Sequence, residues 1–169
     1  RTYPGSSQAH TVTILGAGGA ACAIAASLAD LGATDIHFLN RSKTRARRAC
    51  DHLSNYFPKT QFSAHPLTND QFESVSPNSD LIINCTAAGA NGTIEHLPIH
   101  RLPEEAIWCD INYWMDEPPA LGRCQTVGLR TLTGLGMLIH QGLLSFELFT
   151  GYPVEPETVY ALLNHDKPS

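Results

Sequence analysis

The residues best suited to chemistry in this sequence begin with a stretch that is almost without side chains. Residues 16–25 read GAGGAACAIA and directly follow the apolar run TVTIL at 11–15. Between a strand and a helix, Gly16 permits a tight turn, Gly18 lets the backbone approach a pyrophosphate, and Ala21 keeps the helix close to the sheet. Amides at the helix N-terminus then face the phosphates, where the helix dipole favours negative charge. Such turns also occur for packing reasons alone, but this context favours a dinucleotide. The predicted turn consists of Gly16, Ala17, Gly18, Gly19 and Ala20.

A basic stretch after the next expected strand decides between two dinucleotides. An NAD site usually places an acid ~20 residues after the glycines, where it binds the ribose 2′-hydroxyl. That position is Asn40 here, and it leads into Arg41, Ser42 and Arg45. No carboxylate stands there to repel a phosphate, and the arginines can neutralise one; the planar Arg41 guanidinium can also stack on adenine. The alternative is a solvated basic helix face, which we assign to the arginines at 47–48. We predict NADP as the cofactor.

The elements that must position these residues alternate between strand and helix. Short apolar runs such as LIINC at 81–85 are typical of strands buried on both faces. We therefore predict an α/β fold with a doubly wound, parallel six-stranded sheet in the order 3-2-1-4-5-6 and a cofactor cleft between strands 1 and 4. The strands are expected at 11–15, 36–39, 61–64, 81–85, 107–111 and 130–132. The helices are expected at 19–31, 43–56, 69–75, 119–127, 135–149 and 156–164.

The domain organisation follows from these elements. We expect a leading segment at 1–9, a Rossmann-like NADP-binding domain at 10–151, and a C-terminal helix and tail at 152–169, with a hinge at 151–153. The chain starts without a methionine, which we interpret as a fragment or a processed product.

Composition excludes several classes of protein. The 169 residues are 43% hydrophobic and 16% charged, as in a globular domain, and the net charge of −5 argues against a nucleic-acid surface. No run is apolar enough to span a membrane, and no secretory signal is present. Five cysteines without a C-x-x-C pair predict free thiols in a reducing compartment, hence a cytoplasmic protein without glycosylated sequons. We interpret His96 and His100 as surface residues and expect no metal site.

Separated segments of the chain repeat motifs of one enzyme family. GAGGAA at 16–21 is similar to a phosphate-binding turn and NRSKTRA at 40–46 to an N-R-T motif that binds NADP. IINCTAAG at 82–89 is similar to I-N-A-T-S-x-G, and CDINY at 109–113 to a D-x-x-Y segment. The most specific match is GLGMLIHQG at 134–142, which is similar to G-x-x-M-L-x-x-Q. With these motifs the chain resembles the shikimate dehydrogenase family over residues 10–151.

The resemblance implies roles for individual residues. It implies that the glycine turn binds the pyrophosphate and that the adenosine phosphate is bound by Asn40, Arg41, Ser42 and Arg45. The ribose and nicotinamide would be lined by Thr86, Ala87 and Ile111, with Gly134 and Met137 closing over the nicotinamide. Tyr113 and Gln141 would face the substrate. Without the motif, Gln141 reads as a helix-surface residue and Met137 as core.

Two departures from the family pattern bear on the substrate and the catalytic machinery. Ala88 replaces the usual serine and Trp114 follows Tyr113, which leaves open the exact substrate. The lysine and aspartate that handle the proton in this family belong to an N-terminal substrate domain and match nothing here, so we assign no catalytic residue. We expect the cofactor half of an enzyme, one that binds NADP without turnover and shares a small-molecule substrate with that domain. We also expect self-association through an exposed C-terminal helix, and neither a nucleic acid nor a membrane as partner.

Three functions remain open at this point. The first is NADPH-dependent reduction of 3-dehydroshikimate, or of a quinate or aminoshikimate relative. The second is a regulatory protein that keeps a dehydrogenase-like fold to sense metabolites; the intact cofactor motifs favour the enzyme. The third is another Rossmann enzyme, such as a glutamyl-tRNA reductase-like protein, against which GLGMLIHQG argues.

Overall fold

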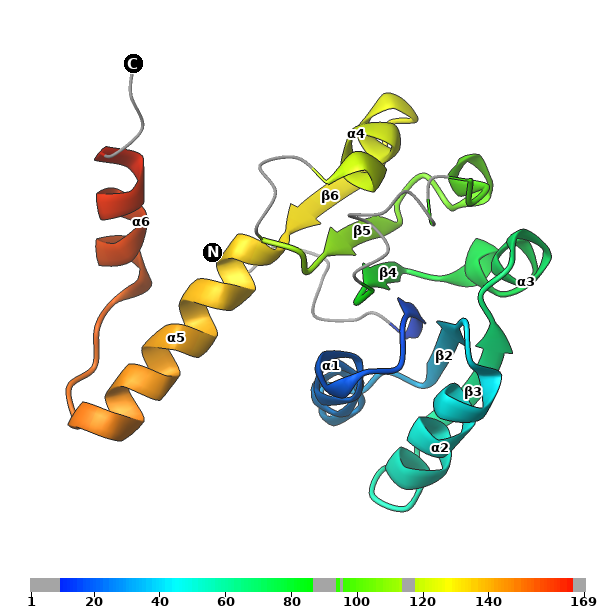
Figure 1. Cartoon of the computed structure of the whole chain (residues 1–169), viewed down its shortest axis with the longest axis horizontal. Coiled ribbons are helices and arrows are strands. Elements are labelled where there is room, and N and C mark those ends of the chain that lie inside the picture. The colour runs from blue at the N-terminus through cyan, green and yellow to red at the C-terminus, as the bar shows by residue number, and fades with distance from the viewer. Residues whose placement is uncertain (1–9, 87–93, 95, 114–117, 166–169) are drawn as a thin grey trace.

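A sheet of six parallel strands forms the centre of the molecule (Figure 1). The computed structural model describes residues 10–86, 94, 96–113 and 118–165. The strand order is β3-β2-β1-β4-β5-β6, and every neighbouring pair is parallel, which confirms the predicted topology. The strands are β1 (Thr11–Leu15), β2 (Asp35–Asn40), β3 (Gln61–Pro66), β4 (Leu81–Asn84), β5 (Ile107–Asp110) and β6 (Arg130–Thr133). Sheet order reverses between β1 and β4, and folds of this kind bind ligands at the carboxyl ends of the strands at that point.

The helices lie close to the predicted ranges. They are α1 (Gly19–Asp30), α2 (Lys43–Ser54), α3 (Asn69–Val75), α4 (Pro119–Thr126), α5 (Gly134–Thr150) and α6 (Pro156–His165). Two short 3₁₀ helices, Ser76–Asn78 and Ile99–Arg101, were not predicted. Gly32 ends α1 as expected: its φ is +99°, and the amides of Gly32 and Ala33 donate to the carbonyls of Ala29 and Leu28.

Side chains that alternate along each strand build two separate cores. Val12, Ile14, Ile36 and Phe38 point to the face that α1 and α2 cover. Leu15, Leu39, Ile82 and Trp108 point to the opposite face, which packs against α3 and α4. Figure 1 shows these helix pairs on the two sides of the sheet. Burial on both faces explains why the strands read as continuous apolar runs.

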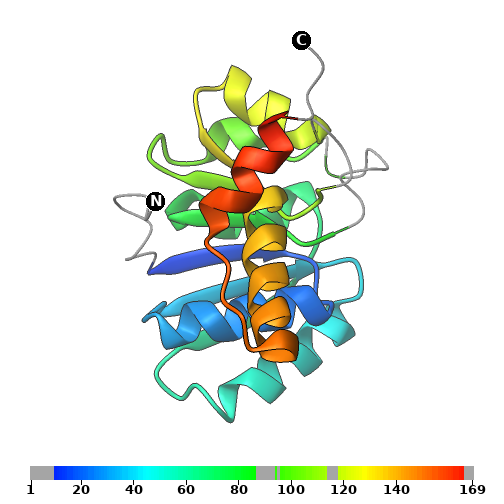
Figure 2. The same cartoon turned by 90° about the vertical axis from the view of Figure 1, so that its left-hand side faces the viewer.

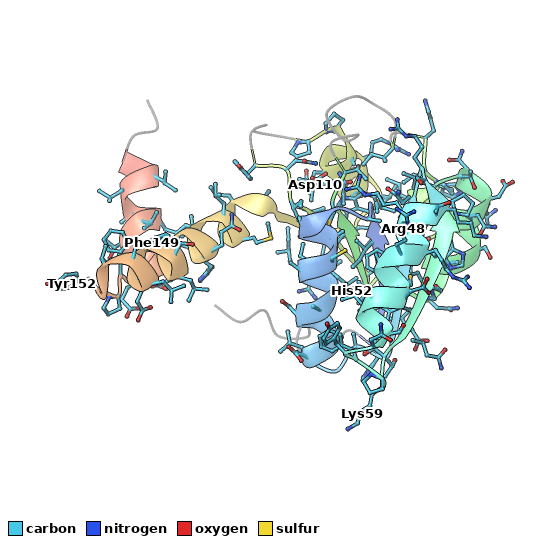
Figure 3. All side chains as sticks on the ribbon, turned by 60° about the horizontal axis from the view of Figure 1, so that its bottom comes forward. Arg48, His52, Lys59, Asp110, Phe149 and Tyr152 are labelled. Carbon is cyan, nitrogen blue, oxygen red and sulfur yellow. The ribbon has the colours of Figure 1, made fainter. Side chains whose placement is uncertain are left out.

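Helices α5 and α6 stand apart from the two covering layers. Figure 2 shows α6 alongside the first turns of α5, and the Tyr160 hydroxyl lies 3.2 Å from where a Cβ on Gly136 would be. Phe149 and Tyr152 are 90% and 72% exposed at the far end of α5 (Figure 3). Leu162 is 63% exposed, so the expected exposure of the last helix is confirmed. Within the described ranges, no helix is long and apolar enough to cross a membrane.

Candidate cofactor-binding site

The glycine turn lies at the carboxyl end of β1, against the end of β4. Gly16 has a φ of +109°, and a Cβ there would be only 3.0 Å from the Cys85 carbonyl oxygen. The Gly16 amide donates to the Leu39 carbonyl at 2.8 Å. Only glycine meets both demands without strain, because side chains rarely adopt that φ and the neighbouring backbone leaves no space. The predicted tight turn at Gly16 is confirmed.

At Gly18 and Gly19, no close contact with a described residue explains why glycine is present. A Cβ on Gly18 would meet only the Arg45 guanidinium, at 4.0 Å, and one on Gly19 would meet nothing within 4 Å. Helix α1 starts here without a side-chain cap, while Ala21 is buried against the sheet. Since no side chain caps α1, its N-terminal amides are the kind of donors that a phosphate-binding turn requires. The residues present fit a dinucleotide pyrophosphate.

Arg45 connects this turn to the basic stretch after β2. Its Nε donates to the Ala17 carbonyl at 3.0 Å, and its backbone amide donates to the Ser42 hydroxyl, which caps α2. The side-chain amide of Asn40 donates to the Ser42 carbonyl at 2.9 Å and thereby stabilises the turn. Arg41 is exposed, and its guanidinium has no hydrogen-bond or ion-pair partner among the described residues. The turn after β2 thus carries an exposed cation at Arg41 and is joined to the glycine turn through Arg45.

A buried polar network joins the ends of β4 and β5. The Asp110 carboxylate accepts from the Asn84 side-chain amide at 2.8 Å, from the Asn112 backbone amide at 3.0 Å and from the Asn112 side-chain amide. The Asn84 side-chain oxygen accepts from the amide and the hydroxyl of Thr86, at 3.0 and 2.6 Å. The Asn112 side chain also donates to the Thr86 carbonyl. These bonds fix the direction in which the chain leaves both strands.

Helix α5 begins at the same edge of the sheet, where the carboxyl ends of β4 and β5 lie. A Cβ on Gly134 would lie 2.3 Å from the Ile111 carbonyl oxygen, so glycine is what allows α5 to begin against the end of β5. Met137 and Tyr113 are 36% and 49% exposed, and Gln141 is also exposed. The structure thus brings Thr86, Ile111 and Gly134 to one edge. Ala87 lies outside the described residues.

Comparison with known proteins identifies the fold's relatives. The family model described as Shikimate / quinate 5-dehydrogenase matches residues 2–132, most of the chain. The model described as Shikimate 5'-dehydrogenase C-terminal domain matches residues 134–163. The chain belongs to the shikimate/quinate dehydrogenase family.

Individual relatives agree with this assignment. The shikimate dehydrogenase (NADP(+)) of Chelativorans sp. (strain BNC1) is 38% identical over 146 residues, which cover 86% of this chain and 49% of that relative. The crystal structure of shikimate 5-dehydrogenase from Listeria monocytogenes in complex with shikimate and NAD has a TM-score of 0.81 and 26% identity, over 92% of this chain and 56% of that one. A shikimate dehydrogenase in complex with NADP+ has a TM-score of 0.75 and 28% identity, over 95% and 56%. The chain spans about half the length of the curated relatives it matches.

Three polar residues of this dehydrogenase-family site were not assigned a role from the sequence. They are Asn84, Asp110 and Asn112, which form the centre of the network between β4 and β5. Their signal was visible in LIINC and CDINY, where a polar residue ends an otherwise apolar strand. Paired ends of parallel strands meet at one edge, so both segments were candidates for the site.

Burial keeps two thiols near the site, Cys85 and Cys109, protonated at neutral pH. All five cysteines are free. Burial, with the neighbouring Cys109 and Asp110, raises the pKa of Cys85 to about 12, and burial with Asp110 raises the pKa of Cys109 to about 11. Since the thiolate is the reactive form, both side chains act as packing groups at neutral pH. No three His, Cys, Asp or Glu side chains of the described part are grouped so as to hold a metal.

Proposed function

We propose that this chain is the NADP-binding domain of a dehydrogenase that interconverts 3-dehydroshikimate and shikimate, or a quinate-type relative of that pair. The bond between Arg45 Nε and the Ala17 carbonyl carries the proposal. It holds the phosphate-binding turn and the basic β2–α2 turn together, so one ligand with a pyrophosphate and a further phosphate can bind both. NADP is such a ligand, and its reduced form, NADPH, supplies the hydride in reductions of ketones.

The residues divide into those that bind the cofactor and those that face the substrate. Amides of Gly16 to Ala20 would bind the pyrophosphate, and Asn40, Ser42 and Arg45 would hold the turn from which Arg41 reaches the 2′-phosphate. The ribose and nicotinamide would lie against Thr86, Ala87 and Ile111, with Gly134 and Met137 closing that end. Tyr113 and Gln141 would orient the substrate, because a glutamine amide both donates and accepts as a hydroxylated ring requires.

The residues at the end of β2 are the reason for proposing NADP rather than NAD. Asn40 offers no carboxylate there, and its side chain is engaged with the Ser42 carbonyl. A 2′-phosphate would meet exposed positive charge at Arg41 rather than repulsion. The Chelativorans relative is named for NADP(+) and one solved relative is in complex with NADP+, which supports this choice, whereas the Listeria structure holds NAD.

We further propose that a second domain supplies the proton and the remaining substrate contacts. Reduction of a ketone requires an acid that delivers a proton to the developing alkoxide. Asp110 is the acid that ends β5 at this edge, and its two oxygens already accept three N–H groups. Relatives about twice as long leave room for such a domain, and the apolar surface of α5 and α6 would pack on it.

A fusion tests this function. The N-terminal half of the Chelativorans relative, joined to this chain, is expected to oxidise NADPH when 3-dehydroshikimate is added, whereas the chain alone binds NADPH without turnover. Turnover by the chain alone would show that it contains the acid. A fusion that binds NADPH but reduces neither 3-dehydroshikimate nor 3-dehydroquinate would favour a metabolite-sensing protein instead.

A further inference from the structure

The carboxylate of Asp110 is buried, and no ion pair to it is found among the described residues. The side chain is 0% exposed. Its oxygens accept one bond from Asn84 and two from Asn112, the acceptor-only pattern of an ionised carboxylate. The ion pairs found among the described residues are Arg47–Asp51 and Arg101–Glu73, both on the surface. Amide N–H groups therefore stabilise this charge.

The position of Asp110 in the fold places the field of its carboxylate at the proposed nicotinamide end of the site. Asp110 is the last residue of β5, pairs with Thr133 next to the start of α5, and precedes Ile111. Through Asn84 it is linked to Thr86 at the end of β4. Figure 3 shows Asp110 in the sheet part of the molecule, far from the exposed tip at Phe149. Of the residues that would line the ribose and nicotinamide, Ile111 follows Asp110 directly, and Thr86 is linked to it through Asn84.

The charge of Asp110 is felt by groups around it. Besides burial, the main cause, Asp110 contributes to raising the pKa of Cys109 to about 11 and of Cys85 to about 12. On α4, burial raises the pKa of Cys124 to about 12, and Asp110 again adds to the shift. The same negative field would favour a cation placed near it, because a buried site screens charge far less than water does.

We propose that Asp110 is a specificity-determining residue that favours the oxidised cofactor, NADP+, over NADPH. The inference rests on the proposed function, in which the nicotinamide lies against Thr86 and Ile111. The nicotinamide ring carries a positive charge in NADP+ and none in NADPH, so a nearby carboxylate attracts one form only. Contacts to the rest of the cofactor are shared by both forms and cancel from the ratio of the two dissociation constants.

The ratio of these two constants tests the proposal. For Asp110→Asn, binding of NADP+ relative to NADPH is expected to weaken by at least ~3-fold, the effect of one charge screened by a partly polar interior. A purely structural role would weaken both forms alike and leave the ratio unchanged. Asp110→Ser provides a second neutral variant, because its small hydroxyl can still accept from Asn84. Circular dichroism before each titration verifies that the variants are folded.

Moving the carboxylate across the network gives a matched control. In Asn84→Asp combined with Asp110→Asn, the carboxylate at position 84 accepts from Thr86 and from the new amide at 110, whose oxygen accepts from Asn112. Every hydrogen bond and the charge are kept, so the ratio should return to within about twofold of the wild type. Asp35→Asn removes one charge at the amino end of β2, whereas Asp110 lies at the carboxyl end of β5. It should leave the ratio of the two dissociation constants unchanged.

The outcomes separate the inference from the function on which it rests. If the wild-type chain binds neither NADP+ nor NADPH, the proposed cofactor site is wrong. If it binds both, and the ratio is unchanged in both neutral variants, Asp110 does not select the oxidised form. A ratio that shifts equally in the charge-swapped variant would also contradict the inference, because the charge is then not its cause.

Discussion

At the scale of single residues, the basic turn after β2 contains one arginine that is engaged with the protein and one that we propose binds the cofactor phosphate. The Arg45 side chain donates to the Ala17 carbonyl, so its truncation would disturb the turn itself, whereas the bond to the Ser42 hydroxyl comes from the backbone amide. Arg41 makes no such contact with described residues and is exposed. The two arginines look equivalent in the sequence, and only the contacts assign them different roles.

Arg41 is therefore the residue to change when the phosphate contact is tested. Arg41→Ala should weaken NADP+ binding by roughly 1.5–3 kcal/mol, at least tenfold, because a charge-assisted contact is lost. NAD+ binding, which lacks the 2′-phosphate, should change little. Isothermal titration of both cofactors measures this, with Arg48→Ala on the exposed face of α2 as the control. Equal losses for NADP+ and NAD+ would contradict the assignment.

At the scale of elements, two glycines of α5 are expected to behave in opposite ways. A Cβ on Gly134 would collide with the Ile111 carbonyl, so Gly134→Ala must move α5 from the edge of β5. Gly142 lies within the same helix, and a Cβ there meets nothing within 4 Å. Gly142→Ala should raise the unfolding free energy by about 0.5–1 kcal/mol, because alanine is the better helix former.

Gly134→Ala should instead lower the unfolding free energy by about 1–3 kcal/mol, the usual cost of an overpacked position, and weaken cofactor binding. Urea unfolding and a cofactor titration of each variant provide the measurements. A Gly134→Ala variant with wild-type stability and affinity would show that α5 is not held against β5.

The elements themselves were largely predictable, and the reasons are local. Thr11–Leu15 and Asn69–Val75 have the predicted bounds, since a sharp change of residue type marks each end. Helix α2 ends two residues early, at Ser54, because the amides of Tyr56 and Phe57 both donate to the Leu53 carbonyl in a tighter turn.

The glycine turn and the basic turn were predictable for the same reason, since each is a continuous segment. The network around Asp110 was not. Asn84 and Asp110 are 26 positions apart and meet only through the register of β4 and β5. A sequence motif reports residues that are adjacent in the chain, whereas this contact depends on how strands pair.

At the scale of the whole molecule, the buried thiols predict that the free energy of unfolding falls at alkaline pH. Burial raises the pKa of Cys124 from 9.0 to about 12, so the folded state holds this proton more tightly than the unfolded chain. The resulting stabilisation is complete below pH 9 and is lost as the pH rises toward 12. Urea unfolding at pH 8 and pH 11 should therefore show a steeper loss in the wild type than in Cys124→Ala. Parallel losses would contradict this.

The surface of α5 and α6 predicts how the chain behaves in solution. Leu148 and Phe149 are 86% and 90% exposed and adjacent to Tyr152. Because apolar groups gathered on one surface drive association, we expect self-association that rises with concentration. Sedimentation should show less self-association in the double variant that carries Leu148→Ser and Phe149→Ser. Leu31→Ser, a change at an isolated site that is 73% exposed, should leave it unchanged. A wild-type chain that stays monomeric throughout would contradict the expectation.

Cofactor binding by the chain itself tests the account most directly. Calorimetric titration of the 169-residue chain with NADP+ and with NAD+ compares the two ligands at one site. We expect NADP+ to bind at least ~10-fold more tightly, a difference of about 1.4 kcal/mol that the proposed contact of Arg41 with the 2′-phosphate would supply. Equal affinities would contradict the NADP assignment, and no binding of either cofactor would contradict the proposed site as a whole.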